Sequence, residues 1–203
     1  MTCSQRHIQP INTCAKSMED ASVNTETINV ANNMAHKLTN QNKGPAIIMD
    51  IEASGFGAGS YPIEVGLAFP DGDAQCYLIK PEKEWTHWDK EAEAVHGIKK
   101  ETLTEYGTDA RTVAQHLNSL LRGKTVYCDG WSKDVSWLAT LFESVDNTPL
   151  FRIETLTKIL SETQLNNWEK IKDKVIQELG LTRHRASADA LILQHTYQRS
   201  FEI

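Results

Sequence analysis

The amino-acid sequence predicts a mixed α/β domain in which helices cover a central β-sheet. A short, continuously apolar run at residues 46–49 is typical of a buried central strand. Two further strand-like segments follow it, and the later part of the chain alternates strand patterns with helical ones. With 203 residues the chain is long enough for one sizeable domain and an appendage, but too short for two comfortable domains.

The expected domain begins as a three-stranded meander. After Gly44-Pro45, the apolar run at 46–49 forms the first strand. Residues 63–69 and 74–79 are two more strand candidates, and Pro70-Asp71-Gly72-Asp73 between them has the composition of a turn. This pair is therefore expected to form an antiparallel hairpin.

Strands and helices alternate in the rest of the domain. Apolar residues at helical spacing predict helices over 112–121 and 131–142, with a fourth strand at 125–128 and a fifth at 150–153. Residues 155–201 are expected to be mostly helical, broken by a loop at 180–185. The pattern therefore predicts five strands with helices packed on the sheet.

Residues 1–43 differ from the rest of the chain. They are rich in Asn, Thr and Ser and lack sustained apolar periodicity, so we expect a flexible N-terminal tail ahead of a domain at 44–203. Helically spaced apolar residues predict one short helix at 28–38 within this tail.

The composition excludes several classes of protein. Apolar residues make up 40% and charged residues 24%, which is ordinary for a globular protein. No stretch approaches the roughly 20 apolar residues that span a bilayer, and the first ten residues contain no apolar run. We therefore expect no membrane span, no secretory signal and a cytoplasmic location. The net charge of −6 argues against coating long nucleic acid, but not against holding the end of a strand.

The cysteines show no metal-ligand spacing. Their positions are Cys3, Cys14, Cys76 and Cys128, without a CxxC pair. We predict reduced thiols that act as small apolar side chains, and no zinc site.

The first candidates for chemistry are Asp50 and Glu52, which follow the first apolar run. Side chains two apart in a strand share one face, so both carboxylates would lie side by side. At ~4 Å and an effective dielectric of ~20, their repulsion is on the order of 4 kcal/mol. A divalent cation would relieve it, and hard oxygen ligands suit Mg²⁺ or Mn²⁺. The alternative is an exposed strand end with two solvated acids.

Asp134 is the second candidate. It follows a turn at Asp129-Gly130, and a helix that begins near Trp131 or Ser132 would place it in the first helical turn. Its charge would there complement the helix dipole, with or without a functional role. Asp129 competes as the functional acid, but its place before Gly130 suits a turn residue better.

The third candidate is the segment His184-Arg185-Ala186-Ser187-Ala188-Asp189. A helix that begins at or near Ser187 would carry Asp189 in its first turn and leave His184 on the preceding loop. A loop histidine near a helix-borne carboxylate suits a general base acting on metal-bound water. The alternative is a surface histidine in a loop.

Together these segments resemble one known family. Asp-x-Glu after a first strand, a later Asp, and then His-x-Ala-x-x-Asp are similar to the DEDDh subgroup of 3′→5′ exonucleases. Proofreading subunits of bacterial replicases, ribonuclease T and oligoribonuclease belong to this superfamily. The resemblance covers nearly all of residues 46–197 and leaves the tail unmatched. Its most specific element is His-x-Ala-x-x-Asp, which also separates this subgroup from the tyrosine-bearing one.

The resemblance implies a ribonuclease H-like fold, with a five-stranded mixed sheet and an active site at one edge. It implies that Asp50, Glu52, Asp134 and Asp189 hold two divalent ions, Mg²⁺ or Mn²⁺. One ion activates water in this family and the other stabilises the departing 3′ oxygen. His184 would accept the proton of the water. The substrate would be the 3′ end of single-stranded DNA or RNA, released as nucleoside 5′-monophosphates.

Expected substrate contacts lie next to the first acidic pair. The family commonly has Thr-Gly there, whereas this chain has Ala53, Ser54, Gly55 and Phe56. Their backbone would approach the terminal nucleotide, and Phe56 would either stack on a base or belong to the core. A second departure is Cys128-Asp129-Gly130, which stands where the family often has His-Asn.

Other substrate contacts are expected further along the chain. His96, within Val95-His96-Gly97-Ile98, matches a common His-Gly-Ile turn near the substrate groove, or is simply a turn or capping residue. Arg185 is the expected phosphate contact, with Arg183, Lys99 and Lys100 as further candidates. Solvated surface charges are the alternative for all four.

Two other functions compete with the exonuclease. A catalytically silent module that binds nucleic acid or a protein usually lacks one of the acids or the histidine, but all five are present here. A ribonuclease H-like endonuclease is disfavoured by the His-x-Ala-x-x-Asp element. The sequence does not choose between DNA and RNA. It leaves open whether the protein is a homodimer, as several relatives are.

Overall fold

The computed structural model describes residues 45–202. The predicted tail, its helix at 28–38, Cys3 and Cys14 lie outside this range, so those predictions are not tested. Within it, five strands form one mixed sheet in the order β3-β2-β1-β4-β5. The strands are β1 (Ile47–Ala53), β2 (Pro62–Ala68), β3 (Ala74–Leu78), β4 (Thr125–Cys128) and β5 (Arg152–Thr155).

The strand directions confirm the predicted meander. β1, β2 and β3 are successively antiparallel, and β4 and β5 run parallel to β1. β1 is longer than the predicted run at 46–49, because buried Ile51 and Ala53 continue the strand through Asp50 and Glu52. β5 begins at Arg152, slightly later than predicted.

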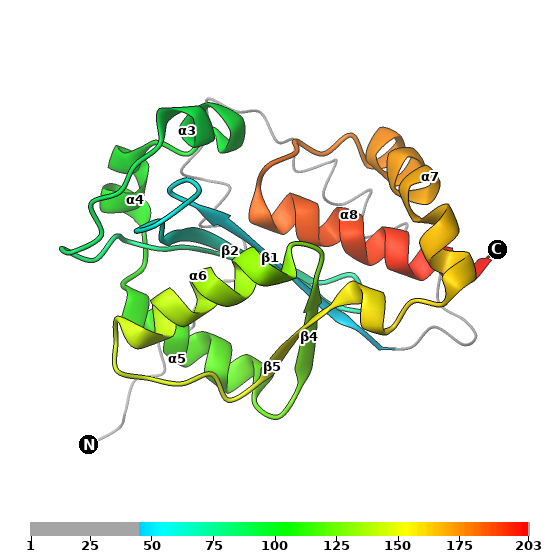
Figure 1. Cartoon of the computed structure of the whole chain (residues 1–203), viewed down its shortest axis with the longest axis horizontal. Coiled ribbons are helices and arrows are strands. Elements are labelled where there is room, and N and C mark those ends of the chain that lie inside the picture. Colours follow the sequence, from blue (N-terminus) through cyan, green and yellow to red (C-terminus); the bar gives the residue numbers. More distant parts are fainter. Residues whose placement is uncertain (1–44, 203) are drawn as a thin grey trace, which may run out of the picture.

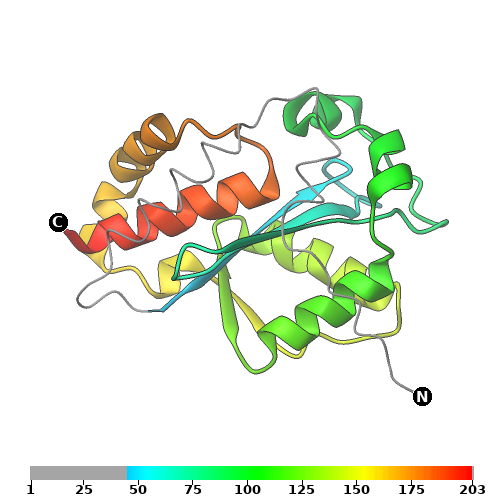
Figure 2. The same ribbon diagram turned by 180° about the vertical axis from the view of Figure 1, so that it is seen from behind.

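Helices cover both faces of this sheet (Figures 1 and 2). The predicted helices at 112–121 and 131–142 are confirmed, and the expected helical region after 155 holds two long helices separated by the predicted loop. The helices are α3 (Lys90–His96), α4 (Lys100–Tyr106), α5 (Ala110–Leu121), α6 (Trp131–Glu143), α7 (Glu162–Leu179) and α8 (Ala186–Arg199). Short 3₁₀ turns, η1 (Leu156–Lys158) and η2 (Ser200–Glu202), follow β5 and α8.

Local sequence signals set several helix ends. The Asp109 side chain accepts a hydrogen bond from the Thr112 N–H at the start of α5. Ser161 and Gln164 form a capping box at the start of α7, and Gly180 ends that helix with φ 58°. The break between α7 and α8 therefore follows from the sequence.

Alternate residues of β1 enter two different cores. Met49 and Ile51 pack with α5 and α6 in one apolar cluster. Ile48 packs with α7 and α8 in another. Because side chains alternate along a strand, Asp50 and Glu52 lie on the same face as Ile48. This places both acids on the face covered by α8.

Helices α3 and α4 were not predicted. Each spans seven residues, and each buries a single side chain, His96 in α3 and Leu103 in α4. Such short helices show no apolar periodicity in the sequence. They lie at the end of the molecule away from the C-terminus (Figure 1).

Two further findings concern the expectations from composition. Cys76 and Cys128 are free thiols, as predicted. Among residues 45–202, no helix combines the length and apolar character needed to cross a bilayer.

Candidate active site

Asp50 and Glu52 lie in the second half of β1, where the sheet is irregular. The pairing register of β1 and β2 shifts just after Glu52, which faces Glu64 across the strands. Burial raises the pKa of Asp50 well above its usual range, and the charges of Asp134, Glu52 and Asp189 raise it further. Burial, followed by the charges of Glu64 and Asp189, raises the pKa of Glu52 to about 7. Ionisation of either acid is therefore unfavourable in the folded chain.

Asp134 lies in the first turn of α6, as predicted. Burial raises its pKa to about 7, partly opposed by the neighbouring Cys128 thiol. Within residues 45–202, its buried Oδ2 has no hydrogen-bond partner. Gly130 adds no side chain beside this oxygen, and a Cβ there would come within 3.3 Å of it. Asp129 is instead an exposed turn residue that pairs with Lys172 of α7 at 3.0 Å.

A glycine on β2 lets α8 begin directly against the sheet. A Cβ at Gly66 would lie 2.2 Å from the backbone of Ala186, so a side chain at this position is excluded. Gly66 is the register partner of Asp50. The first turn of α8 is thereby held over β1, and Asp189 in that turn is brought next to Asp50 and Glu52.

Asp189 orders the loop that precedes its own helix. His184 donates its backbone N–H to Asp189 Oδ2 at 2.9 Å, and Arg183 donates from Nε to Oδ1 at 2.7 Å. His184 adopts φ 62°, a left-handed conformation that few residues other than glycine take. The loop is thus bent so that the exposed imidazole stays beside the acids.

Glu64 of β2 holds the other end of the same loop, next to the start of α8. Its fully buried carboxylate accepts hydrogen bonds from Arg185 Nε at 3.0 Å, from the Ala186 N–H at 2.8 Å and from Cys76 Sγ at 3.1 Å. It also forms an ion pair with Arg185 Nη2. Burial would raise the pKa of Glu64, but these bonds and the charge of Arg185 together lower it. Glu64 of β2 therefore caps the N-terminus of α8, because it accepts the hydrogen bond of the first N–H of that helix.

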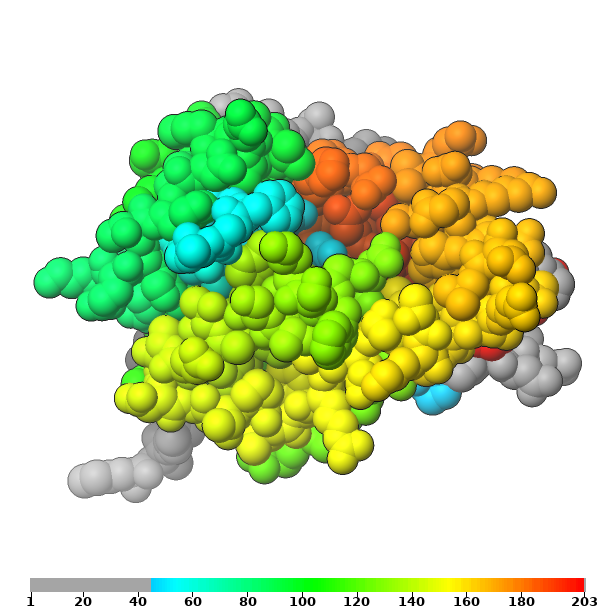
Figure 3. Space-filling model, in the orientation of Figure 1, coloured from blue at the N-terminus to red at the C-terminus, as the bar shows by residue number. Residues whose placement is uncertain are grey.

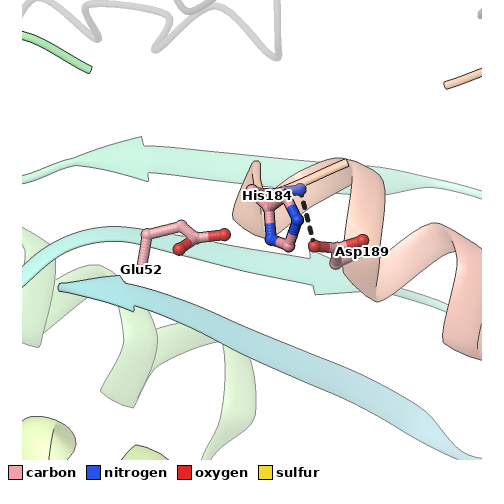
Figure 4. A group of neighbouring side chains, drawn as sticks. All are labelled: Glu52, His184 and Asp189. Atoms are coloured by element: carbon pink, nitrogen blue, oxygen red, sulfur yellow. Dashed lines mark hydrogen bonds between the residues drawn. The ribbon is translucent and has the colours of Figure 1, made fainter. Parts of the chain in front are cut away.

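The predicted site residues converge from three elements. Ligand atoms of Glu52, His184 and Asp189 all lie within 4.8 Å of one another (Figure 4). Asp50 and Asp134 are outside this group, but the charge of Asp134 raises the pKa values of Asp50 and Glu52. In the space-filling view, atoms from the start of the described chain, coloured blue, reach the surface between yellow-green α6 and orange-red α8 (Figure 3).

This arrangement fits divalent metal ions. The donors are hard carboxylate oxygens. Three of the acids, Asp50, Glu52 and Asp134, have raised pKa values that a cation would lower again. The buried Asp134 Oδ2 offers lone pairs that no other described group uses.

The predicted substrate loop is mostly buried. Ser54 Oγ accepts from the Tyr61 N–H at 3.1 Å and hydrogen-bonds His87 Nδ1 at 3.2 Å. Gly55 has φ 144°, and a Cβ there would lie 2.5 Å from that of Asp89. Ala53 is also buried. Contact between these residues and a substrate stays a prediction.

Phe56 differs from the rest of this loop. Its side chain is 68% exposed, so the alternative that it belongs to the core is wrong. Its ring lies 6.0 Å from that of Trp137, and Lys133 Nζ lies 5.8 Å from its centroid. An exposed aromatic ring beside an ammonium group suits a stacked base and its phosphate.

The other two predicted substrate residues are held by the protein. His96 is buried at the end of α3, and its Nδ1 accepts from the Ile98 N–H at 3.0 Å, as expected of a turn residue. Its Nε2 is buried without a partner in the described chain. The Arg185 guanidinium is bound by Glu64. A substrate contact at either residue stays a prediction.

Three residues of the site were missed or misjudged from the sequence. None of Glu64, Lys133 and His87 was among the candidate residues of the sequence analysis. Adjacency to Asp134 was the one signal for Lys133. Neither Glu64 nor His87 carries a local signal, because their partners are far away in sequence.

Solved structures with the same fold include those of E. coli exonuclease I. Its complex with a dT13 oligonucleotide matches with a TM-score of 0.60 and 12% identity, over 76% of this chain and 40% of that one. Its zinc-bound complex with ssDNA matches with a TM-score of 0.59 and 14% identity, over 74% and 39%. The predicted architecture, a five-stranded mixed sheet flanked by helices, is thereby confirmed, and it is the fold of these exonuclease structures.

The extent of this similarity is limited. The chain spans about 40% of the length of the exonuclease I chains that it matches. No protein-family model and no curated protein sequence matches it.

Proposed function

We propose that this chain is a metal-dependent 3′→5′ exonuclease acting on single-stranded nucleic acid. The observation that carries the proposal is the convergence of Asp50, Glu52, Asp134 and Asp189, with His184 beside them. Three of these acids have raised pKa values and no ion pair in the described chain. The fold shared with exonuclease I, whose structures contain single-stranded oligonucleotides, supports the same function.

The four carboxylates would hold two divalent ions, Mg²⁺ or Mn²⁺. Bound ions would supply Lewis-acid activation of water and stabilisation of charge at the scissile phosphate. Asp50, Glu52 and Asp134 would bind through oxygens free of competing ion pairs. Asp189 Oδ2 accepts one hydrogen bond from the His184 N–H and keeps a lone pair for an ion, whereas Oδ1 accepts from Arg183.

His184 is the proposed general base. Its backbone is fixed by Asp189, and its imidazole is exposed within reach of the acids. It would accept the proton of a water molecule that attacks phosphorus. The bond from phosphorus to the 3′ oxygen then breaks, the 3′ oxygen takes up a proton, and a nucleoside 5′-monophosphate leaves.

Phe56 and Lys133 are the proposed contacts for the terminal nucleotide. Phe56 would stack on a base, and Lys133 would approach a phosphate. DNA and RNA both contain bases and phosphates, so contacts at Phe56 and Lys133 would not exclude either substrate.

A 5′-end-labelled strand with Mg²⁺ or Mn²⁺ tests the proposal. A ladder that shortens from the 3′ end is expected, and it should disappear with a chelator or in an Asp50→Asn/Asp134→Asn double variant. Internal cuts would indicate an endonuclease instead. Tight strand binding without any cleavage would indicate a silent binding module. Matched DNA and RNA strands in the same assay identify the preferred sugar.

A further inference from the structure

Arg183 forms an ion pair with Asp189, one of the proposed metal-binding carboxylates. Its Nε donates to Asp189 Oδ1 at 2.7 Å, and the side chains are 39% and 13% exposed, respectively. Among the acids of the proposed centre, Asp189 is the one that has an ion pair within residues 45–202. A cation of the protein itself thus contacts an oxygen that is proposed to bind a metal ion.

Arg185, two residues later, shows a different kind of pair. Its side chain is 14% exposed and its partner Glu64 is fully buried. Separating these two would leave a buried charge without a partner, which is strongly unfavourable. Arg183 can leave Asp189 and enter solvent, because two-fifths of its side chain is already exposed.

On the basis of the proposed metal-dependent activity, we propose that Arg183 is a placeholder for a divalent ion. It neutralises Asp189 in the metal-free protein and gives up Asp189 Oδ1 when the ion binds. A guanidinium and a divalent ion near one oxygen repel each other. The ions would be held by the four carboxylates together, whereas Arg183 holds only one of them. Arg183 therefore lowers the metal affinity of the site while it stabilises the metal-free loop.

Titration calorimetry with Mn²⁺ alone tests this competition directly. The proteins compared are the wild type, Arg183→Gln, Arg183→Lys and Arg152→Gln. Loss of one charge-assisted hydrogen bond corresponds to roughly a tenfold change in an equilibrium constant, so Arg183→Gln should bind Mn²⁺ about tenfold more tightly. Arg183→Lys should fall between this variant and the wild type.

Arg152→Gln is the matched control. It removes the same charge from an exposed residue at the start of β5, at the end of that strand away from the acids. Its Mn²⁺ affinity should equal that of the wild type. Unchanged or weaker Mn²⁺ binding in Arg183→Gln would overturn the proposal.

Thermal melting separates competition from a purely structural role. Arg183→Gln should lower the Tm in chelator and leave the Tm in saturating Mn²⁺ unchanged. An equal loss under both conditions would mean that the pair is merely structural, against the proposal. If the wild type bound no Mn²⁺, both this inference and the proposed function would fail. Binding by the wild type without tightening in Arg183→Gln would overturn this inference alone.

Discussion

The acids of the site form two groups that differ in how their charge is compensated. Asp50, Glu52 and Asp134, which we call the acids without an ion pair, have raised pKa values, and none of them forms an ion pair in the described chain. Glu64 and Asp189, which we call the arginine-bound acids, each bind an arginine of the loop before α8. The acids without an ion pair would therefore need a cation from outside the chain to offset their charge, whereas the arginine-bound acids use the protein's own cations to shape the loop.

Asp50→Asn should have the largest effect on activity and the opposite effect on stability. Removal of a ligand charge should reduce turnover below detection on an end-labelled strand. The metal-free protein should become more stable, because a buried carboxylate that is repelled by Asp134, Glu52 and Asp189 is gone. Wild-type turnover, or a lower Tm in chelator, would contradict this assignment of Asp50.

His184→Asn should reduce turnover by roughly 10²–10⁴-fold, the usual contribution of a general base. Asparagine is chosen because it tolerates the left-handed φ of 62° better than alanine does. Affinity for Mn²⁺ should be retained, because the four acids remain. A large loss of Mn²⁺ binding would show instead that His184 is a ligand, and the difference between the two groups of acids would then need revision.

Glu64→Gln tests whether the arginine-bound acids are structural. The variant leaves the mostly buried Arg185 without its charged partner, so the free energy of unfolding should fall by about 3–5 kcal/mol. Urea denaturation in chelator measures this loss. Glu178→Gln is the matched control, because Glu178 pairs with Arg199 while 47% exposed, and its loss should stay below about 1 kcal/mol. Similar small losses of unfolding free energy in both variants would show that Glu64 has no structural role.

The stability of the metal-free protein should also depend on pH. Glu52 and Asp134 keep their protons up to about pH 7 when folded, but release them near their ordinary values of 4.5 and 3.8 when unfolded. Between these values the folded state binds more protons, so the free energy of unfolding contributed by these acids falls as the pH rises. Saturating Mn²⁺ should abolish this fall, because the ion stabilises the ionised carboxylates.

Melting between pH 5 and 7.5 in chelator and in Mn²⁺ checks this prediction. His96 acts in the opposite direction below its ordinary pKa of 6.5, because burial lowers its pKa. The relevant quantity is therefore the difference between the wild type and a Glu52→Gln/Asp134→Asn variant. Identical slopes for these two proteins would contradict the raised pKa values of Glu52 and Asp134.

Most of the fold was predictable because its signals are local. The apolar run at 46–49, the turn at Pro70–Asp73 and the capping residues around α7 each depend on neighbours in the chain. Helices α3 and α4 escaped prediction because each buries one residue, which leaves no periodicity. The ends of β1 and β5 were displaced because long-range pairing, rather than local composition, sets where a strand stops.

The candidate acids were also predictable, but their environments were not. The spacing around Asp134 and His184 pointed to the correct turn and helix starts. The choice of Asp134 over Asp129 agrees with their positions, since Asp129 is exposed and bound to Lys172. Arg185, however, was expected at a phosphate and lies against Glu64, a partner that only the sheet register brings close. Phe56 could not be assigned to solvent or core until its exposure was known.

The sequence by itself determined the order of the elements and the chemical kinds of group in the site. Those properties follow from periodicity, turn residues and a motif within short segments. Only the tertiary structure decided which charges meet, because Gly66 lets α8 rest on β2 and so brings residues 183–189 onto the acids of β1. Electrostatic interactions depend on distance and burial, and neither is encoded within one segment. The division between the acids without an ion pair and the arginine-bound acids is therefore a property of the folded chain.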